Sequence, residues 1–295
     1  MKTIDITTNV GCKIRCDFCP QDKLIPAYRN RGGVLRMTLG AFREILGKIP
    51  RDASLDFSGM SEPWLNPDCT EMLLHAHERG YEVAAFTTTT GMSEADAERI
   101  KSVPFRRFVV HLPDMERYSK IDVSDEYLKL LARIVESAIP NCEFMTMGTL
   151  PREVTAVIGR RIKRTRMMSR AGNLANVRAP ERLAGPIRCR SCGDSLDHNM
   201  LLPNGDVILC CMDYGLRHVL GNLLVSDYRE LFESESFKRV QAGLDDDSFD
   251  ILCRYCENAA SLDEYERPEK KRRFGNLRSL LKSFMPAADE NRPRP

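Results

Sequence analysis

The first 172 residues alternate between short apolar segments with strand character and longer segments with helical periodicity, and this alternation restricts the fold more than any other feature. Strands that alternate with helices form a parallel sheet, and six such units indicate a partial or open barrel. We therefore predict an α/β fold with a partial, TIM-like (β/α)6 barrel. The expected strands are 3–10, 53–60, 81–91, 106–114, 142–150 and 165–172. The expected helices are 38–49, 67–80, 93–103, 124–139 and 152–162.

Polar and reactive residues follow several of these predicted strands. Cys12, Glu62, Thr90, His111 and Gly148 all fall at or just beyond a predicted strand end. Active sites of such barrels lie at the C-terminal ends of the strands. We therefore expect these residues to converge on one face.

Composition excludes some classes of partner. Lys plus Arg number 44 and Asp plus Glu number 42, so the formal net charge is only +2, which gives no reason to expect nucleic acid. No segment has the length of a signal peptide core or of the ~20 apolar residues that span a membrane. We expect a cytoplasmic protein, whose 11 cysteines serve metal binding or catalysis instead of disulfides.

Three cysteines follow the first predicted strand with the spacing C-x3-C-x2-C: Cys12, Cys16 and Cys19. Thiolates are soft ligands that select zinc, copper(I) or iron–sulfur clusters. A zinc site normally pairs two short knuckles, whereas one loop with three thiolates suits three corners of a cubane cluster. The fourth iron then stays open to bind and activate another molecule.

This loop resembles the hallmark of the radical S-adenosylmethionine (radical SAM) superfamily, and Phe18 matches the aromatic residue that the family lays near the adenine. The segment FSGMSEPWLNP (57–67) resembles the family's Gly-Gly-Glu-Pro motif, with Ser61 at the second glycine. The resemblance implies that backbone groups around Gly59 and Ser61, with the Glu62 carboxylate, hold the methionyl ammonium of SAM. TTTTG (87–91) resembles the family's Thr-Asn-Gly, with Thr90 facing ribose or substrate, although β-branched residues also simply favour a strand.

The resemblance implies a mechanism and further cofactor needs. The amino and carboxylate groups of SAM chelate the open iron of a 4Fe–4S cluster. One electron, from a flavodoxin- or ferredoxin-type donor, then cleaves SAM to a 5′-deoxyadenosyl radical that abstracts a substrate hydrogen. His111 and the pair Ser169-Arg170 could face the cavity, as a base or as substrate anchors, or could be structural. Arginine is a poor base, so anchoring is the simpler role for Arg170.

Six further cysteines lie between residues 189 and 256. One interpretation is a zinc ribbon that pairs Cys189-x2-Cys192 with Cys253-x2-Cys256, but it leaves Cys210 and Cys211 unexplained. The other is a resemblance to the Twitch module, the shortened relative of the SPASM domain. It implies one auxiliary 4Fe–4S cluster on Cys192, Cys210, Cys253 and Cys256, with Cys189 as the alternative to Cys192.

The chain after residue 173 changes character. DHNMLLPNGDVILCC (197–211) predicts a β-hairpin with Asn204-Gly205 in its turn, and 228–243 predicts a helix. We predict three parts: a radical SAM core at 1–175, a small Twitch/SPASM-like α+β module at 176–262, and a basic, amphipathic and disordered tail at 263–295.

Two basic segments have alternative interpretations. GRRIKRTRMMSR (159–170) could attract an anionic small-molecule substrate or be a solvated helix face. In the tail, FGNLRSLLKSF (274–284) places its apolar residues on one helical face just after KKRR, so it could make peripheral contact with an anionic membrane, or pack against the core or a partner.

These features predict a radical SAM oxidoreductase with two 4Fe–4S clusters. By similarity to the single-auxiliary-cluster dehydrogenase of aminoglycoside synthesis, we expect two-electron oxidation of an alcohol carbon on a sugar or aminocyclitol. One alternative is peptide modification or epimerisation, in which Cys69 or Cys142 would donate hydrogen if either faces the cavity. The non-enzyme alternative is a zinc-stabilised binding module.

Overall fold

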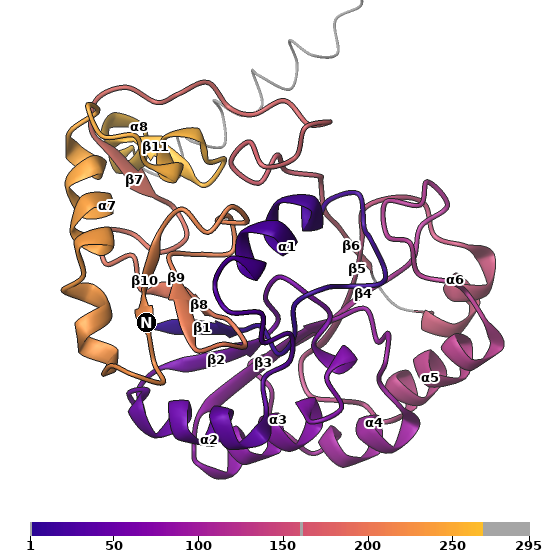
Figure 1. Cartoon of the computed structure of the whole chain (residues 1–295). Helices are drawn as coiled ribbons and strands as arrows, with labels where there is room; N and C mark the ends of the chain where they lie inside the picture. Colours follow the sequence, from indigo (N-terminus) through magenta and orange to yellow (C-terminus); the bar gives the residue numbers. More distant parts are fainter. Residues whose placement is uncertain (1, 160–161, 268–295) are drawn as a thin grey trace, which may run out of the picture.

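A computed structural model describes residues 2–159 and 162–267. Its main feature is a nine-stranded sheet with the order β10-β9-β8-β1-β2-β3-β4-β5-β6 (Figure 1). Strands β1 to β6 are parallel and follow one another across the sheet, as the sequence predicts. They are β1 (Thr3–Ile6), β2 (Ser54–Phe57), β3 (Glu82–Thr87), β4 (Arg107–His111), β5 (Cys142–Thr146) and β6 (Ile162–Arg164).

The helices that connect these strands lie along one side of the sheet (Figure 1). They are α2 (Leu39–Lys48), α3 (Cys69–Glu78), α4 (Glu94–Ile100), α5 (Asp125–Glu136) and α6 (Arg152–Ile158). Alternate strand residues, such as Ile4 and Phe57, belong to the same buried cluster as helix residues such as Phe42 and Leu73. Because side chains alternate across a strand, the residues between them face the other side, which forms the inside of the partial barrel.

Hydroxyl side chains cap the beginnings of α2 and α4. Thr38 accepts the N–H of Ala41 at 3.1 Å at the start of α2. Ser93 and Asp96 form a capping box at the start of α4. Such caps satisfy backbone donors that the first turn leaves unpaired.

The C-terminal part continues the same sheet at its β1 edge. Strand β8 (His198–Leu201) pairs with β1 in parallel, and β9 (Asp206–Ile208) and β10 (Val219–Asn222) follow antiparallel. The predicted hairpin is confirmed, with Gly205 at φ +87° in the turn between β8 and β9. A Cβ there would lie 2.6 Å from Asn222 Oδ1, so the turn requires glycine.

A second, two-stranded sheet and short helices complete this part. The sheet pairs β7 (Ile187–Cys189) with β11 (Ala259–Ser261). The helices are α7 (Glu235–Asp245), α8 (Leu262–Glu266) and the 3-10 helices η2 (Tyr228–Phe232) and η3 (Leu252–Tyr255). A third 3-10 helix, η1 (Pro63–Leu65), follows β2 in the barrel.

Three sequence predictions need correction. The sixth strand is Ile162–Arg164, not 165–172, because Gly159 ends α6 in a left-handed conformation at φ +54° and the strand begins sooner. The helix expected at 228–243 is divided into η2 and α7, because Ser234 caps a new helix by accepting the N–H of Phe237 at 3.2 Å. Helix α1 (Gln21–Arg29) was not predicted, since it contains Pro26 and begins only two residues after Cys19.

Other sequence predictions fall partly or wholly outside the described residues. The amphipathic segment 274–284 lies beyond residue 267, and residues 160–161 of the basic segment are not described. Within 2–159 and 162–267, no helix combines the length and apolar character needed to cross a membrane. The boundaries of the three predicted parts remain a prediction.

Candidate functional site

The C-terminal ends of the barrel strands surround a cavity of about 300 Å³, a size typical of small-molecule sites. Most of the predicted site residues line it together: Cys12, Cys16, Phe18, Cys19, Gly59, Ser61, Glu62, His111 and Arg170. We call this space the SAM cavity. Its wall also includes residues that the sequence did not suggest, namely Gln21, Phe86, Val109, Met145 and Tyr214.

Some predicted residues lie elsewhere. Thr90 lines a separate hollow of about 500 Å³ between the cysteine loop and helices α4 and α5. Ser169 is fully buried and does not line the SAM cavity. Cys69 is fully buried against the core, and neither it nor Cys142 lines the SAM cavity, which removes the condition under which either would donate hydrogen.

The three sulfurs of the cysteine loop each have nearby donors. Burial raises the pKa of the Cys12 thiol, although its sulfur accepts the N–H groups of Ile14 and Glu62. Burial raises the pKa of the Cys16 thiol to about 12, although a hydrogen bond from the Lys120 N–H acts to lower it. Donors to sulfur stabilise thiolate and tune iron–sulfur clusters, so this arrangement fits the chemistry of a cluster.

Cys19 has two side-chain partners from different parts of the chain. Gln21 Nε2 donates to its sulfur at 3.1 Å and also to the Met60 carbonyl oxygen at 2.6 Å. The Tyr214 hydroxyl lies 3.5 Å from the same sulfur. Since Tyr214 follows Cys210 and Cys211 in the C-terminal part, that part contributes directly to the SAM cavity.

Glu62 is buried and already accepts four hydrogen bonds. Its Oε1 accepts the Thr87 hydroxyl at 2.6 Å and the Trp64 N–H at 3.2 Å. Its Oε2 accepts the N–H and the hydroxyl of Thr88, at 2.6 and 2.7 Å. Burial nevertheless raises the pKa of this carboxyl. The carboxylate therefore ties the loop after β2 to the end of β3, a role that the motif did not reveal.

The loop around Glu62 is closely fitted to β1 and its continuation. Gly59 has φ +88°, and a Cβ there would lie 2.2 Å from Thr7 Oγ1. Ser61 Oγ accepts a hydrogen bond from Asn9 Nδ2 at 2.8 Å. Close packing thus explains the glycine at position 59, and a local hydrogen bond explains the small hydroxyl residue at position 61. Neither explanation requires a ligand.

His111 presents an unsatisfied nitrogen in the wall of the SAM cavity. Its Nε2 is buried and has no hydrogen-bond partner among the described residues. Burial and the nearby Arg170 cation lower its pKa to about 4, so the ring is neutral at neutral pH. Its ring meets Phe18 edge to face, with centroids 5.2 Å apart. A buried polar atom without a partner indicates a place for a ligand.

Arg170 supplies a cation to the same cavity. Its Nε donates to the Phe18 carbonyl oxygen at 3.4 Å, and it interacts electrostatically with Tyr214, Cys211 and Cys19. Burial lowers the pKa of its guanidinium, but the electrostatic interactions with these residues and with Glu257 outweigh burial and raise it. Arg170 therefore stays charged, which suits an anchor and excludes a general base.

The six C-terminal cysteines surround a second, smaller cavity of about 80 Å³, which we call the auxiliary cavity. Cys189 and Cys192 share a hydrogen bond that lowers the pKa of Cys189 and raises that of Cys192. Cys210 packs against the main core, whereas Cys211 packs on the side of Cys19 and Tyr214. Both cysteines line the auxiliary cavity, and Cys211 also belongs to the apolar cluster that contains Cys19 and Tyr214.

The spacing of the sulfurs bears on the zinc alternative. Within the described residues, no three cysteine sulfurs lie within 4.8 Å of one another. Thiolates on one tetrahedral zinc ion, with Zn–S bonds of about 2.3 Å, lie about 3.8 Å apart. A cubane cluster, whose irons stand between the sulfurs, spans a wider space. A four-thiolate zinc geometry is therefore not preformed among the described cysteines.

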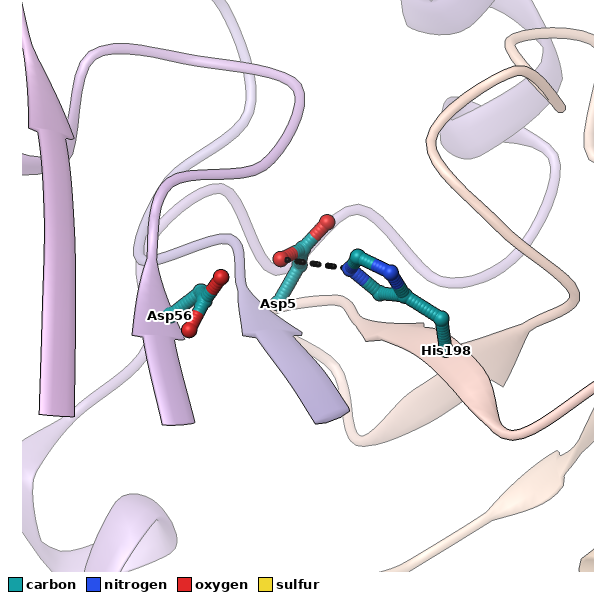
Figure 2. A group of neighbouring side chains, drawn as sticks. All are labelled: Asp5, Asp56 and His198. Carbon is teal, nitrogen blue, oxygen red and sulfur yellow. Dashed lines mark hydrogen bonds and ion pairs between the residues drawn. The ribbon is translucent and has the colours of Figure 1, made fainter. Parts of the chain in front are cut away.

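One group in the described part of the chain does have closely spaced potential ligands: Asp5, Asp56 and His198, on three neighbouring strands (Figure 2). His198 Nε2 lies 3.3 Å from Asp5 Oδ1, which raises the pKa of the imidazole. Arg106 pairs with Asp56 at 2.5 Å. His198 and the Arg106 guanidinium thus each contact one of the two carboxylates, and we assign no metal to this group.

Sequence reasoning missed the residues that connect the two cysteine sites. Tyr214 and Glu257 belong to no motif, and only their positions shortly after auxiliary cysteines offered a signal. Gln21 follows the cysteine loop by two residues, where a helix was not expected.

Comparison with known proteins agrees with the second cysteine site. The family model SPASM, described as an iron–sulfur cluster-binding domain, matches residues 187–257. No curated protein matches the sequence.

Solved structures resemble nearly the whole chain at low sequence identity. BtrN in complex with AdoMet and 2-DOIA has a TM-score of 0.60 and 12% identity, over 89% of this chain and 94% of that chain. Native anSMEcpe with bound AdoMet has a TM-score of 0.53 and 12% identity, over 86% of each chain. SuiB of Streptococcus suis, bound to the precursor peptide SuiA, has a TM-score of 0.57 and 13% identity, over 86% of this chain and 69% of that chain.

These matches confirm the predicted fold. The chain has the partial-barrel fold of these structures, and residues 187–257 match the SPASM model. This match and the six C-terminal cysteines support an iron–sulfur cluster at the second cysteine site.

Proposed function

We propose that this protein is a radical SAM oxidoreductase that oxidises an alcohol carbon of a sugar or aminocyclitol by two electrons. Bound at the N-terminal cluster, SAM would supply a 5′-deoxyadenosyl radical that takes a hydrogen atom from the substrate carbon. The chain's own residues would bind the substrate, keep water out and take up the remaining proton, and the auxiliary cysteines would hold the cluster that accepts the remaining electron.

The observation that carries this proposal is that Arg170 and Tyr214 stand between the two cysteine sites. Both line the SAM cavity, and Arg170 interacts electrostatically with Cys19 on one side and with Cys211 on the other. A substrate in the SAM cavity would therefore lie near the auxiliary site. A closed auxiliary cluster suits the second oxidation step, since it can accept one electron without binding the substrate.

His111 and Arg170 would have different roles toward the substrate. Neutral His111, with its free Nε2, would accept a hydrogen bond and then the proton from the reacting hydroxyl. Arg170 would anchor an oxygen or an anionic group of the substrate with its fixed charge. Phe86, Val109 and Met145 supply apolar walls that limit the access of water.

The relatives include complexes with a small molecule and complexes with peptides, among them anSMEcpe with the Kp18Cys peptide, of which this chain spans 86%. The BtrN complex contains AdoMet and 2-DOIA, and this chain spans 94% of BtrN. It spans 69% of SuiB, whose complex contains a precursor peptide. Peptide modification or epimerisation is thus the alternative outcome of the same experiment.

The experiment uses anaerobically prepared protein with both clusters, reductant and SAM. Candidate sugars, aminocyclitols and peptides carrying deuterium on carbon are tested for transfer of deuterium into 5′-deoxyadenosine. We expect transfer from a secondary alcohol carbon and a product two hydrogens lighter. Transfer from a peptide, or a product that has replaced its deuterium with a solvent hydrogen, would replace oxidation by the alternative.

Several related expectations remain proposals. They are a flavodoxin- or ferredoxin-type electron donor, attraction of anionic substrates by the basic segment, and a cytoplasmic location. The exposed side chains of Lys163, Arg164 and Arg166 are compatible with the second of these.

A further inference from the structure

A strained turn lies between the two cysteine sites. Arg170, Ala171 and Gly172 have φ of +55°, +54° and +79° in succession. Residues with a side chain rarely adopt this left-handed conformation, so surrounding contacts must hold it. We call residues 169–174 the Arg170 turn.

Glu257, the residue after Cys256, holds this turn from the auxiliary side. Its Oε1 accepts the N–H of Ser169, and its Oε2 accepts the N–H of Ala171 at 3.2 Å. Backbone N–H groups that converge in a left-handed turn form a concave site for an anion. The Glu257 carboxylate occupies that site, and hydrogen bonds to a charged acceptor are strong.

The segment that contains Cys210, Cys211 and Met212 also supports the Arg170 turn. Asn173 Nδ2 donates to the Arg170 carbonyl oxygen at 2.8 Å and to the Met212 carbonyl oxygen at 2.9 Å. Ala171 also packs with Met212 and Cys256 in one buried cluster. The Arg170 turn is thus attached to both cysteine segments, 210–212 and 256–257.

From this turn the Arg170 side chain reaches the other site. Its Nε donates to the carbonyl oxygen of Phe18, the residue before Cys19, and its charge interacts with Cys19. A cation near an iron–sulfur cluster favours the reduced, more negative form and raises the reduction potential.

We propose that Glu257 is a positioning residue that holds the Arg170 cation beside Cys19 and thereby raises the reduction potential of the N-terminal cluster. Formation of the auxiliary site would order residues 253–257, and this would make the N-terminal cluster easier to reduce. This inference rests on the proposal that both sites hold clusters, but it does not depend on which substrate is oxidised.

The test measures the midpoint potential of the N-terminal cluster by spectroscopically monitored redox titration of protein loaded with both clusters. We expect Glu257→Gln and Arg170→Gln each to make this potential more negative. Loss of the Glu257 charge acting directly would shift it in the opposite direction, so the sign distinguishes positioning from simple electrostatics. The double variant should show no further negative shift, because both changes remove the same contribution.

Two further variants make the test specific. Glu257→Asp keeps the carboxylate and should recover part of the shift. Glu264→Gln is the matched control, since Glu264 lies in α8 of the same module and pairs on the surface with Arg190 at 3.5 Å. It should leave the potential unchanged.

Iron and acid-labile sulfide are measured first, so that absence of clusters counts against the proposed function and not against this inference. With both clusters present, an unchanged or more positive potential in Glu257→Gln overturns the proposal, as do additive negative shifts in the double variant. If Glu257→Gln does not load the auxiliary site, Glu257→Asp and Asn173→Ala replace it. Each should give a smaller negative shift, and unchanged potentials in both would overturn the proposal.

Discussion

Both cysteine sites offer thiols as metal ligands, but they are assembled from the chain in opposite ways. The first takes its three thiols from one loop of eight residues, Cys12 to Cys19, directly after a strand. The second collects its thiols from three segments, of which the first and the last are separated by about sixty residues. The first site is local in sequence, whereas the second depends on β7, β9 and η3 reaching their places.

The surroundings of the sulfurs differ in part. Sulfurs of the first site accept hydrogen bonds from the Gln21 side chain and from the N–H groups of Ile14 and Glu62. In the second, Cys189 and Cys192 hydrogen-bond to each other, the Asn258 N–H donates to Cys256, and burial raises the pKa of Cys253 to about 12. Both sites thus have donors that can tune a cluster, and those of the first site include the side chain of Gln21.

The most severe test of this comparison is Cys16→Ala. It removes one of only three ligands at the first site, so SAM cleavage should be abolished, and iron should fall from about eight to about four per chain. Production of 5′-deoxyadenosine and iron content measure both effects. Cys142→Ala is the control, because Cys142 lines neither cavity. Undiminished 5′-deoxyadenosine from the Cys16 variant would refute the assignment.

Cys253→Ala should damage the second site and spare the first. We expect about four irons to remain, together with SAM cleavage, while formation of oxidised product is lost. Cys189→Ala and Cys192→Ala should differ from each other, because only one of these two thiols is needed as the fourth ligand. Equal iron loss in both would mean that the pair acts together.

Glu62→Gln tests a residue that supports the first site without removing any of its three thiols. The amide nitrogen would replace one carboxylate oxygen and leave the buried donors on that side without an acceptor, which costs about 1–3 kcal/mol each. Denaturant unfolding under anaerobic conditions should show destabilisation of that order. Glu71→Gln, which breaks an exposed ion pair with Arg99, should cost less than about 1 kcal/mol. Equal losses of stability in the two variants would show that the hydrogen bonds of Glu62 contribute no more than an exposed ion pair.

His111 gives the SAM cavity a pH dependence. Its pKa of about 4 in the folded protein lies below the unfolded value of about 6.5, so the unfolded chain binds the proton more readily. Stability should therefore fall as pH decreases from about 6.5 to about 4, by about 3 kcal/mol in total from this group. Unfolding curves across this range should show a weaker pH dependence in His111→Gln. Identical dependence in both proteins would contradict the assigned pKa.

The smallest expected effect concerns the link between the sites. Tyr214→Phe removes one hydrogen bond to the Cys19 sulfur, worth about 0.5–1.5 kcal/mol, and keeps the ring in place. The midpoint potential of the N-terminal cluster should become slightly more negative, since donors to sulfur favour the reduced state. Tyr228→Phe, distant from both cysteine sites, is the control. A shift of the auxiliary cluster alone would contradict the contact with Cys19.

Several features of the site were predictable from the sequence because they depend on neighbours along the chain. The spacing of Cys12, Cys16 and Cys19 follows from one loop, and the turn at Gly205 follows from local backbone chemistry. Strand ends also placed Glu62 and His111 at the cavity, because parallel strands share one C-terminal edge. The sixth strand was misplaced, because a three-residue strand has too short a pattern to locate by periodicity.

The sequence by itself determined the repeating strand–helix pattern, the three-thiol loop and the presence of a second cysteine group, since each is written in contiguous residues. Only the tertiary structure decided that β8 extends the barrel sheet beside β1, and that Tyr214, Arg170 and Glu257 join the two cysteine sites. Those contacts link residues as much as 195 positions apart. The physical reason is that sequence patterns encode the periodicity of single elements, whereas long-range pairing depends on which buried surfaces and polar groups complement one another once the chain is packed.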